Sequence, residues 1–99
     1  MTKIKHYVEQ IDEEICGAKE YAEKYVEYKA LGNSGYATKY KEMAMDELKH
    51  ATYIHDIATN EIDQLSKVFT PTTEMQETWD KSHTKYVEKV AWVKQMLAM

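Results

Sequence analysis

The chain has 99 residues and a formal net charge of −4, and all thirteen of its basic residues are lysines. Arginine is the usual bidentate reader of phosphate and guanine, so its absence argues against nucleic-acid recognition. A single cysteine, Cys16, excludes an intrachain disulfide and suits a reducing compartment. The first ten residues hold no long apolar run, so we expect neither a signal peptide nor a membrane span, and we predict a cytoplasmic protein.

Helix-breaking residues are scarce, with three glycines and one proline in the whole chain. Abundant Ala, Glu, Lys and Met favour a few long helices over strands. A chain of this length forms one domain that buries a smaller fraction of its surface than a large protein, and oligomerisation is a common way to add core. The sequence therefore predicts a single all-α domain over residues 1–99.

The first helix is predicted over about residues 3–31. Its apolar residues recur at spacings of three and four, which is typical of an amphipathic helix. This stripe consists of Ile4, Tyr7 or Val8, Ile11, Ile15, Ala18, Tyr21 or Ala22, Tyr25 and Tyr28. The following Gly-Asn-Ser-Gly at residues 32–35 favours a left-handed C-cap and a tight reversal.

The second helix is predicted over about residues 36–68. Its stripe alternates steps of three and four, as in coiled-coil packing. The members are Ala37, Tyr40, Ala44, Glu47, Ala51, Ile54, Ala58, Ile62 and Leu65. One carboxylate, that of Glu47, interrupts this otherwise apolar stripe, and His50 follows one turn later beside the same face.

The third helix is predicted over about residues 71–97. Either Thr70 caps it with Pro71 at the first helical position, or Thr73 and Gln76 form a capping box. Its stripe consists of Trp79, His83, Tyr86, Val90, Val93 and Leu97. Short turns between long helices predict an antiparallel up-down-up bundle of three helices. In that bundle the third helix covers one side, or mediates higher assembly through Trp79, Trp92 and Met96.

Glu14, Glu47 and His50 are the candidate metal ligands. Glu14 interrupts the first stripe as Glu47 interrupts the second, and a carboxylate in an apolar interface is costly unless it is paired or binds a metal. Counted from the turn, the two glutamates differ in height by about one helical turn at ~1.5 Å per residue. Glu-x-x-His alone occurs by chance in about half of such compositions. Ordinary solvated or ion-paired side chains are therefore the alternative.

Three further residues are weaker metal candidates. Counting from the second turn places His83 level with about residues 55–58, away from Glu47. It is therefore predicted either to form an auxiliary site with His55 or to be an ordinary hydrogen-bonded core histidine. Glu20 also precedes a tyrosine and an alanine, and it competes with Glu14 as the ligand from the first helix. Cys16 adjoins the first stripe and is expected to be buried.

The segment from Glu14 to Tyr21 (EICGAKEY) resembles the first-helix signature of the ferritin-like superfamily, and of rubrerythrins in particular. That signature has a ligand glutamate, a small residue three positions on and a tyrosine seven positions on. The segment from Glu47 to His50 (ELKH) matches the Glu-x-x-His of the second helix. In size and layout the chain is also similar to encapsulated ferritin-like proteins and to small phage-encoded ferritin-like proteins. The resemblance covers about residues 10–65.

The resemblance implies that Glu14, Glu47 and His50 are metal ligands and that Tyr21 is a hydrogen-bond partner behind them. It also implies that Gly17 permits close helix approach beside the site. A complete ferritin-like bundle has four helices and two Glu-x-x-His helices, whereas this chain has one such helix. A homodimer, or a higher even-numbered homo-oligomer, would complete both the four-helix bundle and a shared di-metal site. A shell or cage partner is a further expectation of the resemblance.

Oxygen-rich ligation with one imidazole per metal suits iron, or manganese, better than zinc or copper. The expected function is a di-iron carboxylate site that oxidises Fe(II) in a ferroxidase-type reaction. The alternative is a non-enzymatic helical interaction or assembly protein, such as a phage or shell accessory, without a working metal site.

Overall fold

The computed structural model describes residues 2–68 and 70–99, which form three helices and no strand. These are α1 (Thr2–Ala30), α2 (Ser34–Ser66) and α3 (Thr73–Leu97). Each observed boundary lies within two residues of its predicted position, so the all-helical prediction is confirmed. Within the described ranges, no helix combines the length and apolar character that crossing a membrane requires.

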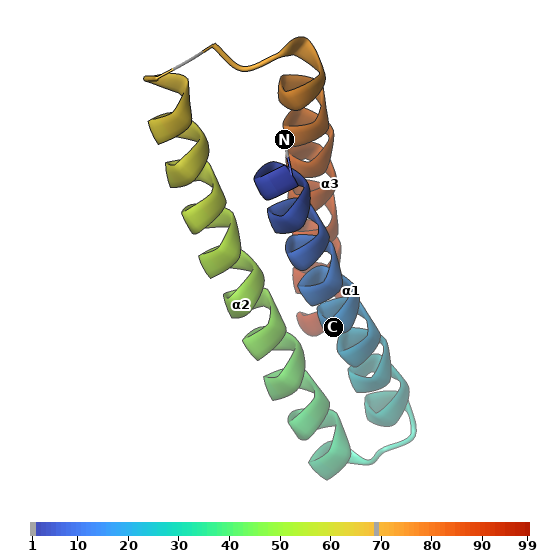
Figure 1. Ribbon diagram of the computed structural model, residues 1–99. Helices are drawn as coiled ribbons and strands as arrows, with labels where there is room; N and C mark the ends of the chain where they lie inside the picture. Colours follow the sequence, from blue (N-terminus) through green and yellow to red (C-terminus); the bar gives the residue numbers. More distant parts are fainter. Residues whose placement is uncertain (1, 69) are drawn as a thin grey trace.

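The turn between α1 and α2 has the predicted chemistry. Gly32 adopts a left-handed conformation with φ of 77°, which a residue with a side chain rarely tolerates. Asn33 caps α2, and its Oδ1 accepts a hydrogen bond of 3.1 Å from the backbone N–H of Tyr36. These two residues let the chain reverse within a few positions, so α1 and α2 lie antiparallel (Figure 1).

Neither predicted cap of α3 is correct. The helix begins one residue after Thr72, whose hydroxyl oxygen accepts a hydrogen bond of 3.1 Å from the backbone N–H of Met75. Thr72 has extended backbone angles (φ −69°, ψ 158°), which are usual for an N-cap residue. Pro71 thus precedes the helix, and Thr73 is already its first residue.

The three helices form a rod of 55 × 18 × 17 Å. In Figure 1, α3 runs in the same direction as α1, and α2 runs opposite to both. Helix α1 packs closely along α2 and also against α3, whereas the backbones of α2 and α3 come close to each other at few positions. Both of the larger helix–helix interfaces therefore involve α1.

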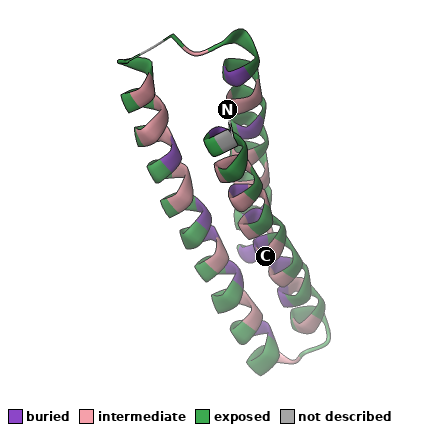
Figure 2. Ribbon diagram, in the orientation of Figure 1, coloured by how far each residue is buried: buried purple, intermediate pink, exposed green. Residues whose placement is uncertain are grey.

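The core follows the predicted stripe of α1 closely, as its inward-facing residues are buried (Figure 2). They are Ile4, Ile11, Ile15, Ala18, Ala22 and Tyr25. On α2, four buried alanines recur every seven residues, at Ala37, Ala44, Ala51 and Ala58. Because interaxial distance depends on the side chains at the contact, this row of small residues lets α2 approach α1 closely. Val93 and Leu97 contribute the buried apolar surface at the end of α3.

Candidate metal centre

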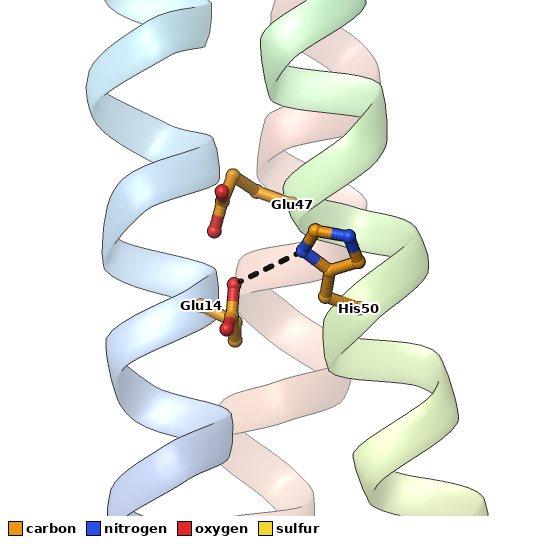
Figure 3. Close-up of side chains that lie close together, drawn as sticks. All are labelled: Glu14, Glu47 and His50. Atoms are coloured by element: carbon orange, nitrogen blue, oxygen red, sulfur yellow. Dashed lines mark ion pairs between the residues drawn. The ribbon is translucent and has the colours of Figure 1, made fainter.

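Glu14, Glu47 and His50 come together at the α1–α2 interface (Figure 3). One ligand atom from each side chain lies within 4.8 Å of the others. His50 Nδ1 is 3.6 Å from Glu14 Oε2. Within residues 2–68 and 70–99, this is the one group of three or more His, Cys, Asp or Glu side chains that meets that distance.

Regular helix geometry explains why these residues meet. Glu47 and His50 are three residues apart on α2, so both project from one side of the helix. The tight reversal at Gly32 and Asn33 fixes the register of α1 against α2, and the Glu14 side chain then comes within reach of the pair. The predicted convergence of the three side chains is confirmed, while metal binding by them stays a prediction.

The three side chains are less buried than the stripe pattern predicts. The Glu14 side chain is 29% exposed and that of His50 is 53% exposed. Glu47 is half-buried, and the buried positions beside it on α2 are Leu48 and Ala51. The site therefore lies at an open edge of the α1–α2 interface, where an added ion or another chain can reach it.

Two carboxyl groups, those of Glu14 and Glu47, lie close together at this edge, with the His50 imidazole beside them. The pKa of Glu47 is raised above its ordinary value of 4.5, first by a hydrogen bond with the Glu14 carboxyl, which needs a shared proton. Burial and the Glu14 charge raise the pKa further, and the nearby His50 acts in the opposite direction. Two carboxylates that compete for one proton are also positioned to share one cation, whose charge would replace that proton.

Gly17 provides the space that the Glu47 carboxylate occupies. A Cβ at position 17 would lie 3.2 Å from Glu47 Oε2 and 3.5 Å from its carboxyl carbon. The first distance is tighter than nine in ten real contacts of a Cβ atom, so the carboxylate would have to shift by a few tenths of an ångström. The absence of a side chain at Gly17 therefore leaves room for the Glu47 carboxylate in its observed position.

A larger surface surrounds the site, and we call it the open face. It is made of residues on α1 and α2 that recur at spacings of three and four, except for one step of seven between Tyr21 and Tyr28 that passes over the exposed Lys24. All of its members are half-buried or exposed. Its members are Tyr7, Gln10, Glu14, Gly17, Tyr21 and Tyr28 on α1, and Tyr36, Tyr40, Met43, Glu47, His50, Ile54 and Ile57 on α2. Aromatic rings cover the part nearest the first turn, where Tyr28 and Tyr40 stack with centroids 5.5 Å apart.

The other α1 candidates lie apart from the ligand group. The Tyr21 ring packs against Tyr40 with centroids 6.1 Å apart. Among the described residues, its hydroxyl makes no hydrogen bond with Glu14 or Glu47, so the predicted supporting bond is absent. Glu20 is exposed and lies near Lys24 and Glu27, outside the group that could hold an ion. The structure therefore places Glu14, and not Glu20, beside Glu47 and His50.

His55 and His83 also meet, as counting from the turns predicted. His55 Nε2 lies 2.9 Å from His83 Nδ1, a hydrogen bond between α2 and α3. The sequence did not predict that Trp79 and Tyr86 would stack on His55, although their spacing around His83 on α3 is a usable signal. The prediction for Cys16 was wrong, because its side chain is exposed.

Comparisons of this chain with protein-family models, with curated proteins and with solved structures gave no match. The case for a metal centre consequently depends on the positions of Glu14, Gly17, Glu47 and His50.

Proposed function

We propose that this protein is a ferritin-like metal-binding protein in which two copies pair through the open face. Glu14, Glu47 and His50 of each copy would then hold a di-iron centre shared by the dimer, with manganese as an alternative metal. Its reaction would be the oxidation of Fe(II), with dioxygen or peroxide as the electron acceptor.

The observation that carries the proposal is the convergence of two carboxylates and one imidazole beside Gly17. Carboxylate-rich ligation with one histidine suits iron and manganese. The raised pKa of Glu47 supports it as well, since the two glutamates are held close at the expense of mutual repulsion. Surplus negative charge of this kind is relieved when a divalent cation binds.

Two features support a shared site. Three protein donors are too few to surround an iron ion, and the half-exposed His50 leaves one side of the group open. The surrounding open face is rich in tyrosine and includes Met43, and tyrosine and methionine are enriched where proteins associate. Pairing α1 and α2 with a second copy would bury these side chains and form a four-helix arrangement around the ligands.

Each ligand has a defined part in this proposal. Glu14 and Glu47 would neutralise the bound cations, and the proton they share would leave as metal enters, so affinity should rise with pH. His50 would bind as a neutral imidazole, and Gly17 keeps the Glu47 carboxylate in place. Two ferrous ions bound there would supply the electrons that reduce dioxygen or peroxide.

The decisive measurement is the iron bound per chain after anaerobic Fe(II) loading and desalting, with the native mass determined in parallel. We expect about one iron per chain in an even-numbered oligomer. Glu47→Ala should abolish retention without loss of helicity, while Glu20→Ala should retain iron fully. Undiminished iron in Glu47→Ala would refute the proposed centre.

The same samples test the alternative, which is an assembly protein that needs no metal. The apolar residues of the open face would also suit that role. A ligand that binds only the native protein raises its apparent stability. An oligomer whose melting temperature is unaffected by Fe(II) and Mn(II) would therefore favour the assembly role.

A further inference from the structure

The contact between His55 and His83 joins two helices that otherwise meet sparsely. His55 Nε2 and His83 Nδ1 are 2.9 Å apart, although 28 residues separate them in the chain. A second link lies beside the pair, where the Thr52 and Tyr86 hydroxyls are 3.3 Å apart. These side chains bridge α2 and α3, whose backbones approach each other far less than either approaches α1.

Aromatic rings fix the orientation of His55. The Tyr86 ring is nearly parallel to it, with centroids 4.4 Å apart and an interplanar angle of 7°. Trp79 stacks on it as well, with centroids 5.5 Å apart. A ring held in this way loses little further freedom when its nitrogen binds a ligand, so the site is preorganised.

The protonation state of the pair also suits a metal. Burial lowers the pKa of His55 below its ordinary value of 6.5, and the neighbouring His83 lowers it further. The Asp56 carboxylate lies 3.9 Å from His55 Nδ1 and favours the proton on that nitrogen. The lone pair of His55 then resides on Nε2, the atom that faces His83. A carboxylate behind a histidine is a common support for metal ligands.

From this geometry we propose a second metal site, in which His55 Nε2 and His83 Nδ1 bind one zinc-class divalent cation (Zn²⁺, Ni²⁺ or Cu²⁺) and clamp α2 to α3. At metal–nitrogen distances of about 2.0–2.1 Å, two nitrogens on a tetrahedral ion lie about 3.3–3.4 Å apart. The observed spacing of 2.9 Å would therefore widen by about 0.4 Å when the hydrogen bond is replaced by the ion. Water completes the coordination.

Binding of the cation moves a proton from one nitrogen of His83 to the other and releases none to solvent overall. With the His55 proton on Nδ1, His83 Nδ1–H is the donor and His55 Nε2 the acceptor in the metal-free pair. When the cation binds, the His83 proton moves to Nε2 of the same ring, through solvent. Both imidazoles stay neutral, and no net proton is released.

This site is independent of the proposed iron centre in place and in chemistry. His50 and His55 are five residues apart on α2, which places them roughly 140° apart around the helix axis. One site offers mainly carboxylate oxygens and the other offers imidazole nitrogens, which prefer later first-row cations. Substitutions can therefore remove the ligands of one site and leave those of the other unchanged.

The test uses a Glu47→Ala/His50→Ala variant, in which the iron centre is removed. Titration with Zn²⁺ should give saturable binding of one ion per chain. It should also raise the melting temperature by about 5 °C or more at saturation, since the ion binds only the folded state. Ni²⁺ should broaden NMR signals of α2 and α3 around positions 55 and 83.

Adding His83→Asn to that variant should abolish all three effects. His83 is exposed, so this change should leave the fold intact, as circular dichroism would verify. His6→Asn, at another exposed histidine, should leave Zn²⁺ binding unchanged. Retention of one Zn²⁺ per chain without His83, or no saturable binding with both histidines present, would overturn the clamp. Neither result would bear on iron binding by Glu14, Glu47 and His50.

Discussion

Gly17 on α1 and Glu47 on α2 fit against each other so closely that a Cβ on Gly17 would lie 3.2 Å from Glu47 Oε2. Gly17→Ala should therefore displace the Glu47 carboxylate by a few tenths of an ångström and weaken metal binding. The same change should stabilise the metal-free protein by up to about 1 kcal/mol, because alanine favours a helix interior over glycine. Isothermal titration with Mn²⁺ and denaturant unfolding measure the two effects.

Gly35→Ala is the matched control for that substitution. Gly35 lies in the first turn of α2, and its nearest neighbour for an added Cβ is Asn33 Oδ1 at an ordinary 3.8 Å. Metal affinity should be unchanged in Gly35→Ala. An equal loss of affinity in both variants would argue against a specific role for Gly17.

Glu47→Gln should separate stability from metal binding. An amide removes the repulsion between the two carboxylates and can donate a hydrogen bond to Glu14. Since the site is half-exposed, we expect a gain of about 0.5 kcal/mol in the metal-free free energy of unfolding. For a chain of this size that gain is about 2–4 °C in melting temperature. The added stability from Fe(II) or Mn(II) should disappear.

Glu20→Gln serves as the control for charge removal, because Glu20 is exposed on α1 and lies outside the ligand group. It should leave metal-dependent stabilisation intact. If the metal-free Glu47→Gln protein melts below the wild type, the carboxylate pair is not a source of strain.

Lowering the pH should decrease the free energy of unfolding of the metal-free protein, because His55 binds a proton more readily in the unfolded chain. The folded-state pKa of His55 lies below its ordinary value of 6.5, so the unfolded chain binds a proton more readily than the folded protein does. The favourable contribution of neutral His55 is therefore fully present above pH 6.5 and decreases as the pH falls below that value. Urea unfolding at pH 7.5 and pH 5.5 should show lower stability at the lower pH.

His55→Gln should flatten that pH dependence, whereas His6→Gln should not change it. An NMR titration gives an independent check, with the His55 ring midpoint expected below 6.5 in the folded protein. A midpoint above that value would reverse the predicted sign.

Ala51→Leu should overpack the α1–α2 interface next to the ligands. Ala51 is fully buried, and it follows Glu47 by one turn of α2. Extra methylenes in such a position cost about 1–3 kcal/mol, which corresponds to a drop of roughly 5–20 °C in melting temperature. Ala91→Leu, at an exposed position of α3, should be nearly neutral in the same thermal unfolding experiment.

The sequence predicted the helices and the convergence at the candidate centre because both depend on regular spacing. The α1 stripe and the Gly32–Asn33 reversal follow from helix periodicity and turn chemistry, and together they fix the level of Glu14 against Glu47. The three threonines at positions 70, 72 and 73, in contrast, offer the same capping group around the start of α3. Only the backbone angles of Thr72 identify the residue that acts as the cap.

Positions at the edge of a stripe were the hardest to predict. Glu47 and Leu48 are adjacent on α2 and both fit a pattern of threes and fours, yet Leu48 is enclosed and Glu47 is half-exposed. Cys16 shows the same difficulty on α1, where it was predicted to be buried and is exposed. The exact rotation of one helix against another decides such positions, and the spacing pattern does not encode it.

The central place of α1 also has a consequence for how the chain folds. Its contacts with α2 are close in sequence, so a helical hairpin of α1 and α2 can form rapidly with little loop-closure entropy. Helix α3 must then dock onto that hairpin through a smaller interface, and its amide hydrogens should exchange with solvent faster than those of α1. Since the candidate iron ligands all belong to the hairpin, they would be assembled before α3 docks.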